Sequence, residues 1–206
     1  MRQRPIIFTH DSVRAILAGR KTQTRRPVKG AHIITCDDRT GVTDTPCPYG
    51  VPGDRLWVRE TWYHAFRRPP NSTGASAGVV YLADDGVNLN PGWSPHGNGK
   101  GWKPSIHMPR WASRITLEVV SVRAQVLQEI DISDALAEGM VPTWDGRDAT
   151  GRRCPGEVDQ FAEVWNTIHG KRCPWESNPW VWAVEFRVIN TEPADLRVRE
   201  MPQVPA

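Results

Sequence analysis

The chain has 206 residues, of which 39% are hydrophobic and 24% charged, and its net charge is +3. This composition supports a packed core and argues against a wholly disordered chain. No stretch approaches the roughly 18 consecutive apolar residues of a membrane span, and the many Gly and Pro residues indicate a loop-rich protein rather than a helical bundle.

The positive charge is concentrated near the N-terminus. Residues 1–30 contain eight Lys and Arg against the single acid Asp11, a local charge of +7. Such a basic segment is typical of a protein that binds an anionic ligand, for example a nucleotide or a nucleic acid. An Arg-rich, solvated surface is the alternative interpretation.

In chain order, residues 5–8 are predicted as a short strand, followed by a helix that Thr9 or Asp11 caps and Gly19 ends. A polar run at 21–26 follows and stops at Pro27. Residues 30–54 are predicted as loop. Residues 55–60 alternate like a strand, whose apolar face carries Leu56, Val58 and Glu60.

Residues 66–105 are predicted as a long insertion around a small strand at 79–82, with a flexible, Gly- and Trp-rich end. A strand at 114–123, a short helix at 132–138 and a second long loop at 141–156 come next. An amphipathic helix at 158–168 and a final apolar strand at 182–188 complete the pattern. The order indicates an α+β fold, a small curved antiparallel sheet or barrel with flanking helices, in one domain over residues 1–190. Residues 191–206 are predicted as a tail.

The four cysteines are Cys36, Cys47, Cys154 and Cys173, and none forms a CxxC pair. The N-terminus lacks the apolar core of a secretory signal, so we expect a cytoplasmic protein with free thiols. A zinc site is the alternative, although the spacings match no common zinc module. No phosphate-binding loop, dinucleotide fingerprint or HExxH motif occurs, so we expect neither a metal nor an organic cofactor.

The string AILAGRKTQTRR at 15–26 resembles the opening of ASCH domains, which belong to the PUA-like superfamily. Four other segments are similar to this family, especially to its phage-encoded members: GDRLWVRETW at 53–62, HMPRWASRITLEV at 107–119, DALAEGM at 134–140 and NPWVWAVEFRVI at 178–189. The resemblance implies a small PUA-like β-barrel with a cleft, here enlarged by the two insertions.

One branch of this family hydrolyses N4-acetylcytidine. Its catalytic residues match Lys21 and Thr24 in the K-x-x-T stretch and Glu138 before Met140, with Gly139 in place of a polar residue. The resemblance implies Thr24 as the nucleophile, Lys21 as the base and Glu138 as the acid or the orienting carboxylate. Other family members bind RNA or modified bases, and one branch is a ribonuclease.

This chemistry has a physical basis. A Thr hydroxyl needs a base to remove its proton, and a Lys acts as that base only where burial or nearby cations lower its pKa. Residues three apart face opposite ways on a regular strand. Lys21 and Thr24 therefore need a bend between them to cooperate, and their alternative role is that of surface residues in a basic strand.

Six further residues are predicted to bind the substrate: Arg26, Arg59, Glu60, Trp62, Arg110 and Trp111. Glu60 also fits a structural ion pair, because a carboxylate on an apolar strand face needs a partner. The Trp residues fit either the core or a base-stacking platform, and Arg110 beside Trp111 fits a cation–π clamp or a surface pair.

The sequence therefore predicts an amidohydrolase, in monomeric form, that removes an acyl group from the N4 amine of a cytidine-type nucleoside or related base. The alternatives are a non-catalytic module that binds RNA or modified bases and a ribonuclease that uses the same basic cleft.

Overall fold

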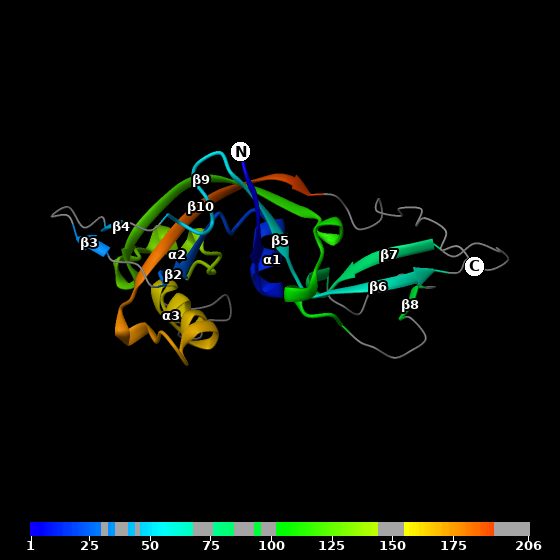
Figure 1. Cartoon of the computed structure of the whole chain (residues 1–206). Coiled ribbons are helices and arrows are strands. Elements are labelled where there is room, and N and C mark those ends of the chain that lie inside the picture. Colours follow the sequence, from blue (N-terminus) through cyan, green and yellow to red (C-terminus); the bar gives the residue numbers. More distant parts are fainter. Residues whose placement is uncertain are drawn as a thin grey trace. The chain divides into compact units, whose positions relative to one another are not determined.

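A computed structural model describes residues 1–29, 33–35, 41–43, 46–67, 76–84, 93–95, 102–143 and 155–191 (Figure 1). The chain divides into two compact units, between which it passes several times. The first comprises Met1–Arg2, Ala15–Arg55 and Glu118–Arg187, and the second comprises Gln3–Arg14, Leu56–Leu117 and Val188–Ala206.

In the first unit, the long strand β9 (Ile115–Val126) lies next to β10 (Trp180–Thr191), which pairs antiparallel with β2 (Gln23–Pro27). The short strands β3 (Ile33–Thr35) and β4 (Gly41–Thr43) pair with each other, and β4 meets β9 at Ala124. The helices are α2 (Ile132–Ala137) and α3 (Glu157–His169), with 3-10 turns at Leu127–Glu129 and Trp175–Ser177. Figure 1 shows α2 and α3 beside the long strands.

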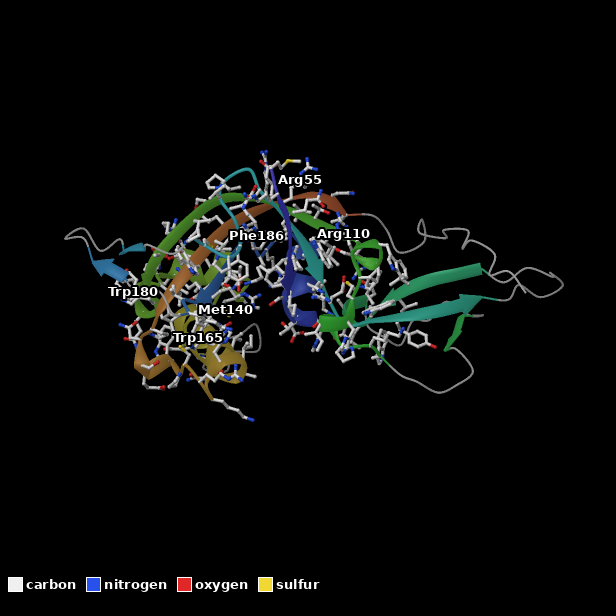
Figure 2. The ribbon with its side chains drawn as sticks, viewed as in Figure 1. Arg55, Arg110, Met140, Trp165, Trp180 and Phe186 are labelled. Atoms are coloured by element: carbon white, nitrogen blue, oxygen red, sulfur yellow. The ribbon has the colours of Figure 1, made fainter. Side chains whose placement is uncertain are left out.

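The helices of this unit cover an apolar core. Phe161 and Trp165 lie four residues apart on α3, so they share one face of the helix, and both are buried against Leu127 and Val181. Met140 packs against the same cluster; Met140 and Trp165 are labelled in Figure 2. This core fixes α2 and α3 together, and α2 also packs against β2.

Local sequence explains where α2 begins and ends. Asp131 caps the helix by accepting a hydrogen bond from the backbone N–H of Asp134, which satisfies a donor that the helix itself leaves free. The chain leaves the helix at Gly139, whose φ is +96°, a conformation that glycine adopts without the steric cost of a Cβ.

In the second unit, β1 (Gln3–Ile7) lies next to β5 (Arg55–Arg59), and β5 lies next to the start of β9. Helix α1 (His10–Leu17) begins in this unit, which also holds an antiparallel sheet of β6 (Trp62–Arg67), β7 (Ser76–Tyr81) and β8 (Trp93–Pro95). Its 3-10 turns are Leu82–Asp84, Ser105–His107 and Arg110–Ala112. Trp62, Tyr81 and Met108 form its buried apolar cluster with Val79 and Ala112.

The structure confirms the mixed helix-and-strand fold and the strand and helix positions predicted for most segments. It corrects two regions: residues 30–54, which were predicted as loop, and the insertion at 66–105, where only a small strand at 79–82 was predicted. Residues 30–54 contain the short strands β3 and β4, and the insertion at 66–105 contributes β7 and β8 to a three-stranded sheet. Strand pairing does not close into a barrel among the described residues, so the barrel remains a prediction.

Other predictions lie outside the described residues: most of the loop at 141–156 and the tail from residue 192. Within the described part of the chain, no helix is long and apolar enough to cross a membrane.

Candidate functional site

The segment that leads into β2 runs alongside α2 and is bonded to it at successive residues. Arg20 donates to the carbonyl of Gly139 at 3.0 Å, and the backbone N–H of Thr22 donates to the carbonyl of Ala137 at 2.8 Å. Between these two contacts, the Lys21 side chain reaches Glu138. Residues 20–22, which lead into β2, and residues 137–139, at the C-terminal end of α2, therefore form one continuous contact, which we call the joint.

Lys21 and Glu138 form a buried ion pair at the centre of this joint. The ammonium Nζ of Lys21 lies 2.5 Å from Oε2 of Glu138 and 2.8 Å from the backbone carbonyl of the same residue. The two side chains are only 5% and 4% exposed. The structure thus brings together two of the three residues that the sequence predicts as catalytic.

Arg25 and Gln23 extend the joint into a network around Asp134. The guanidinium of Arg25 donates to Oδ2 of Asp134 at 2.6 Å and to Oε1 of Glu138 at 3.4 Å. The Gln23 amide donates to Oδ1 of Asp134 at 3.0 Å. Asp134 and Glu138 are four residues apart, so they share the face of α2 that is turned to β2.

Thr24 lies on the face of β2 opposite to that of Gln23 and Arg25. Gln23 and Arg25 both contact α2, and neighbouring strand residues point to opposite faces. Thr24 therefore points away from α2, on the side of Val184, its partner in register on β10. Its side chain is buried, and the Lys21 ammonium donates to the carboxylate and the backbone carbonyl of Glu138. Lys21 lies before β2 begins at Gln23, so cooperation of Lys21 and Thr24 remains a prediction.

The environment of Lys21 lowers the pKa of its side chain. Burial lowers the pKa of Lys21 below its usual 10.5, and the nearby charges of Arg26 and Arg25 lower it further, while Glu138 opposes them. Desolvation is the largest of these effects, because an ammonium loses its hydration in the interior. Lys21 is therefore placed to give up and recover a proton more readily than a surface lysine.

Gly139 allows this close packing. A Cβ at this position would lie 3.0 Å from Cβ of Ala15 and 3.2 Å from Cβ of Lys21. Any larger residue would push the Lys21 stem away from the helix end. The glycine that the sequence analysis marks as a departure from the resembled enzyme is thus explained by packing in this chain.

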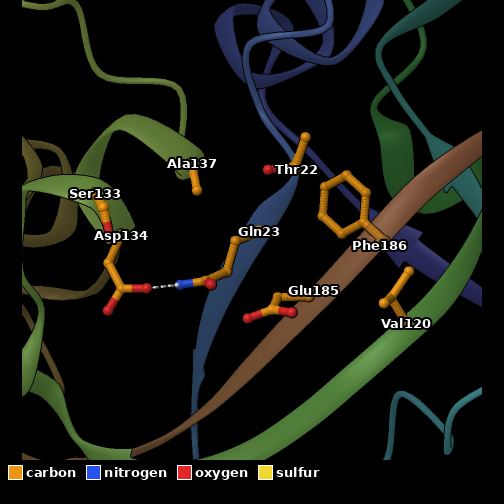
Figure 3. A pocket seen from close by; sticks show the side chains of 8 residues that line it. All are labelled: Thr22, Gln23, Val120, Ser133, Asp134, Ala137, Glu185 and Phe186. Atoms are coloured by element: carbon orange, nitrogen blue, oxygen red, sulfur yellow. Dashed lines mark hydrogen bonds between the residues drawn. The ribbon is translucent and has the colours of Figure 1, made fainter.

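A cavity of about 280 Å³ adjoins the joint (Figure 3). It is lined mainly by polar side chains, with one aromatic ring: Thr22, Gln23, Val120, Ser133, Asp134, Ala137, Glu185 and Phe186. Lys21 and Glu138 directly adjoin the lining residues Thr22 and Ala137 in the chain. Thr22 is exposed, so its hydroxyl, unlike that of Thr24, belongs to an accessible wall.

Arg123 balances the acids at this cavity. It lies 2.5 Å from Glu185 and 3.6 Å from Asp134. Each carboxylate of the lining is therefore paired with a cation.

The remaining predicted residue of this unit, Arg26, lies on β2 opposite Trp182. Burial lowers the pKa of Arg26, opposed by Tyr49 and Glu138.

In the second unit, Glu60 forms the structural ion pair that was the alternative to a substrate contact. Its two oxygens accept from Nε and Nη2 of the buried Arg114 at 2.9 and 3.0 Å. Arg114 also bonds Asp84 at 2.6 Å and stacks over the ring of Tyr81 at 4.0 Å. Burial raises the pKa of Glu60, and Arg114 opposes this shift. These contacts occupy the Glu60 carboxylate fully.

The other predicted substrate-binding residues of this unit form an aromatic and cationic cluster. The guanidinium groups of Arg59 and Arg110 lie 5.4 and 5.9 Å from the centre of the Trp57 ring, within range of a cation–π interaction. Trp62 is buried and packs edge-on against Trp111, with ring centres 5.8 Å apart. Trp111 is 49% exposed.

Arg59 is also tied to the chain that precedes Arg110. It donates to the carbonyls of Met108 and Ile106. These bonds fix one face of the cluster.

The sequence analysis did not identify Gln23, Arg25 and Asp134. One signal for them exists in the sequence. Gln23 and Arg25 occupy alternate positions of a polar strand, and Asp134 and Glu138 are four residues apart at a short helix. The pairing partner of that strand is not visible in the sequence.

No group of three or more His, Cys, Asp or Glu side chains in the described ranges is arranged to hold a metal. Cys47 and Cys173 are not joined in a disulfide, and Cys36 and Cys154 lie outside the described residues. Comparisons with protein-family models, curated proteins and solved structures find no match to this chain. The family resemblance therefore rests on the sequence segments alone.

Proposed function

We propose that the protein is an amidohydrolase that removes an acyl group from the N4 amine of a cytidine-type nucleoside or related base, within a PUA-like barrel fold. One observation carries the proposal: the buried pair of Lys21 and Glu138, 2.5 Å apart, beside a polar cavity. A lysine with a lowered pKa accepts a proton from an attacking hydroxyl, and a carboxylate at its side returns it to the leaving amine.

In this mechanism Glu138 orients Lys21, and Lys21 takes the proton of a threonine hydroxyl as that oxygen attacks the acyl carbon. The proton passes through Glu138 to the N4 nitrogen as the C–N bond breaks, and water then hydrolyses the acyl-threonine ester, which releases the acid and restores the hydroxyl. Two hydroxyls flank Lys21 in the chain. The family resemblance assigns the attack to Thr24, whereas Thr22 lines the cavity. For Thr24 to attack, the acyl group has to reach the face of β2 beside Val184.

The decisive experiment measures hydrolysis of N4-acylated cytosines, cytidines and deoxycytidines by the wild-type protein and two matched variants. Thr24→Ala is expected to lower kcat/KM by at least about 10³-fold, the scale of loss for one member of a catalytic triad. Thr22→Ala removes the same group two residues earlier and is expected to retain most activity. The reverse result would transfer the nucleophile to Thr22, and absence of turnover in the wild-type protein would reject the proposed activity.

Lys21→Arg separates the enzyme from a binding module. A guanidinium keeps the charge but does not give up its proton near neutral pH. An amidohydrolase that uses Lys21 as its base is therefore expected to lose activity, whereas a binding site that needs only the charge keeps most of its affinity. Full hydrolysis by the Lys21→Arg variant would refute the Lys21 base.

A second candidate function, RNA or single-stranded nucleic-acid binding, is favoured by the Trp57 cluster in the second unit. Two guanidinium groups against one indole and the exposed ring of Trp111 provide cations for phosphates and a surface for base stacking. Trp111→Ala is expected to weaken binding of a fluorescent oligonucleotide. Equal affinity of variant and wild type would reject this candidate.

A further inference from the structure

Arg25 is the most deeply buried charged group of the joint between β2 and α2. Its side chain is 0% exposed, and its guanidinium lies 5.9 Å from the ring centre of Phe161. The short bond to Asp134, 2.6 Å, anchors it, and the longer contact of 3.4 Å reaches Glu138. A group so placed contributes to the charge balance of Glu138 without facing solvent or the cavity.

We propose that Arg25 is a positioning residue for the Lys21–Glu138 pair: it holds Oε1 of Glu138 while Lys21 holds Oε2, so that Glu138 remains paired when Lys21 is neutral. A role of Arg25 in catalysis rests on the proposed amidohydrolase function. Its role in holding Glu138 rests on the contacts of Arg25 with Asp134 and Glu138 alone.

The charge balance of the four buried groups changes when Lys21 loses a proton. Lys21 and Arg25 carry two positive charges opposite the carboxylates of Asp134 and Glu138, which leaves the four groups neutral in sum. For Lys21 to act as a base it first has to lose its proton. Glu138 then retains one cation, Arg25, because a guanidinium stays protonated at any relevant pH. Without Arg25, the loss of that proton would leave a buried carboxylate with no cation in contact, which is strongly unfavourable.

Other charges around Lys21 do not replace Arg25. Arg26 interacts electrostatically with both Lys21 and Glu138, whereas Lys21 and Arg25 place their cationic nitrogens on the two Glu138 oxygens, at 2.5 and 3.4 Å. Arg123 contacts Asp134 and Glu185. Arg25 therefore has a specific position that its neighbours do not share.

The test measures the pKa of Lys21 directly, by NMR titration of the lysine side-chain signals, with the Lys21 signal assigned by its loss in Lys21→Met. In Arg25→Met we expect the pKa of Lys21 to rise by at least about one unit, the scale of a nearby charge. Arg123→Met removes a cation from the same network without touching Glu138, so it is the matched control and is expected to leave the pKa unchanged. Circular dichroism reports whether each variant folds.

Arg25→Gln is the second variant, in case Arg25→Met fails to fold, because its amide is able to hydrogen-bond Asp134. It is expected to shift the pKa of Lys21 in the same direction. An unchanged pKa in whichever of the two variants folds would overturn the proposal, as would an equal shift in Arg123→Met. If neither variant folds, Arg25→Lys keeps a cation at this position and is expected to leave the pKa of Lys21 near its wild-type value, and a shift of one unit or more in that variant would overturn the proposal.

Activity gives an independent readout. If the proposed function holds, the rising limb of the kcat/KM profile moves to higher pH in the Arg25 variants together with the Lys21 titration. If the wild-type protein hydrolyses none of the acylated cytosines, the proposed function fails, while the NMR result still decides the role of Arg25.

Discussion

Removal of the Glu138 carboxylate tests the buried pair most directly. In Glu138→Ala, the ammonium of Lys21 loses its carboxylate partner and keeps its bond to the backbone carbonyl of residue 138, at 2.8 Å. A buried charge that loses its partner costs about 3–5 kcal/mol of stability. We therefore expect the free energy of unfolding to fall by about that amount at pH 7.

The size of this loss has an upper limit that depends on pH. Lys21 is able to escape its unpaired charge by releasing a proton, and relative to its usual pKa of 10.5 this release at pH 7 costs about 5 kcal/mol, from about 1.4 kcal/mol per pH unit. At pH 9 the same release costs about 2 kcal/mol. The electrostatic part of the loss cannot exceed these values.

The direction in which the free energy of unfolding changes with pH follows from proton binding. Where Lys21 is neutral in the folded variant and charged in the unfolded chain, the unfolded state binds more protons, so the free energy of unfolding rises with pH. The window lies between the Lys21 pKa of the folded variant, which lacks the raising effect of Glu138, and the higher Lys21 pKa of folded wild type, above which both proteins gain stability with pH alike. The stability of the variant relative to wild type should therefore recover by about 1.4 kcal/mol per pH unit within that window.

Urea denaturation of wild type and Glu138→Ala at pH 7, 8 and 9 measures this. The control is the double variant Lys21→Met/Glu138→Leu, which removes both charges and is expected to restore most of the stability, because apolar replacements of buried pairs are often neutral or stabilising. A loss below about 1 kcal/mol at pH 7, or one that does not shrink by pH 9, would refute the reasoning.

Two further predictions concern stability. Arg114→Met leaves the buried carboxylate of Glu60 unpaired and is expected to cost about 3–5 kcal/mol; Arg187→Met breaks an exposed pair and should cost less than about 1 kcal/mol, which chemical denaturation will compare. Gly139→Ala combines a φ of +96° with a contact of 3.0 Å, whereas Gly19→Ala has φ +72° and open space. Thermal unfolding should therefore show a larger loss at Gly139, by about 1 kcal/mol or more, and equal losses would contradict the packing role of this glycine.

Much of the fold could be predicted from the sequence because its signals are local. The apolar periodicity of α3 and the alternation of β5 and β10 each depend on neighbouring residues. The sheet in the insertion could not be predicted in the same way. Its strands β6 and β8 pair across a long segment rich in Gly and Pro, where local patterns favour loops.

The candidate site was likewise predicted only in part from the sequence. Lys21 and Glu138 lie 117 residues apart in the chain, so only the family resemblance could place them together. The orientation of Thr24 follows from strand alternation once the face of Arg25 is known. Which face Arg25 takes depends on the position of α2, which no local pattern specifies.

The construction of the joint itself favours a role in proton transfer. An apolar contact between β2 and α2 would hold the two elements at least as firmly, since buried ion pairs seldom add net stability. The chain instead buries Lys21 and Arg25 against Asp134 and Glu138. Of the two cations, only the lysine has a pKa that burial lowers toward a range in which it exchanges a proton. A cluster with one exchangeable proton, next to a polar cavity, is the arrangement that the proposed amidohydrolase requires.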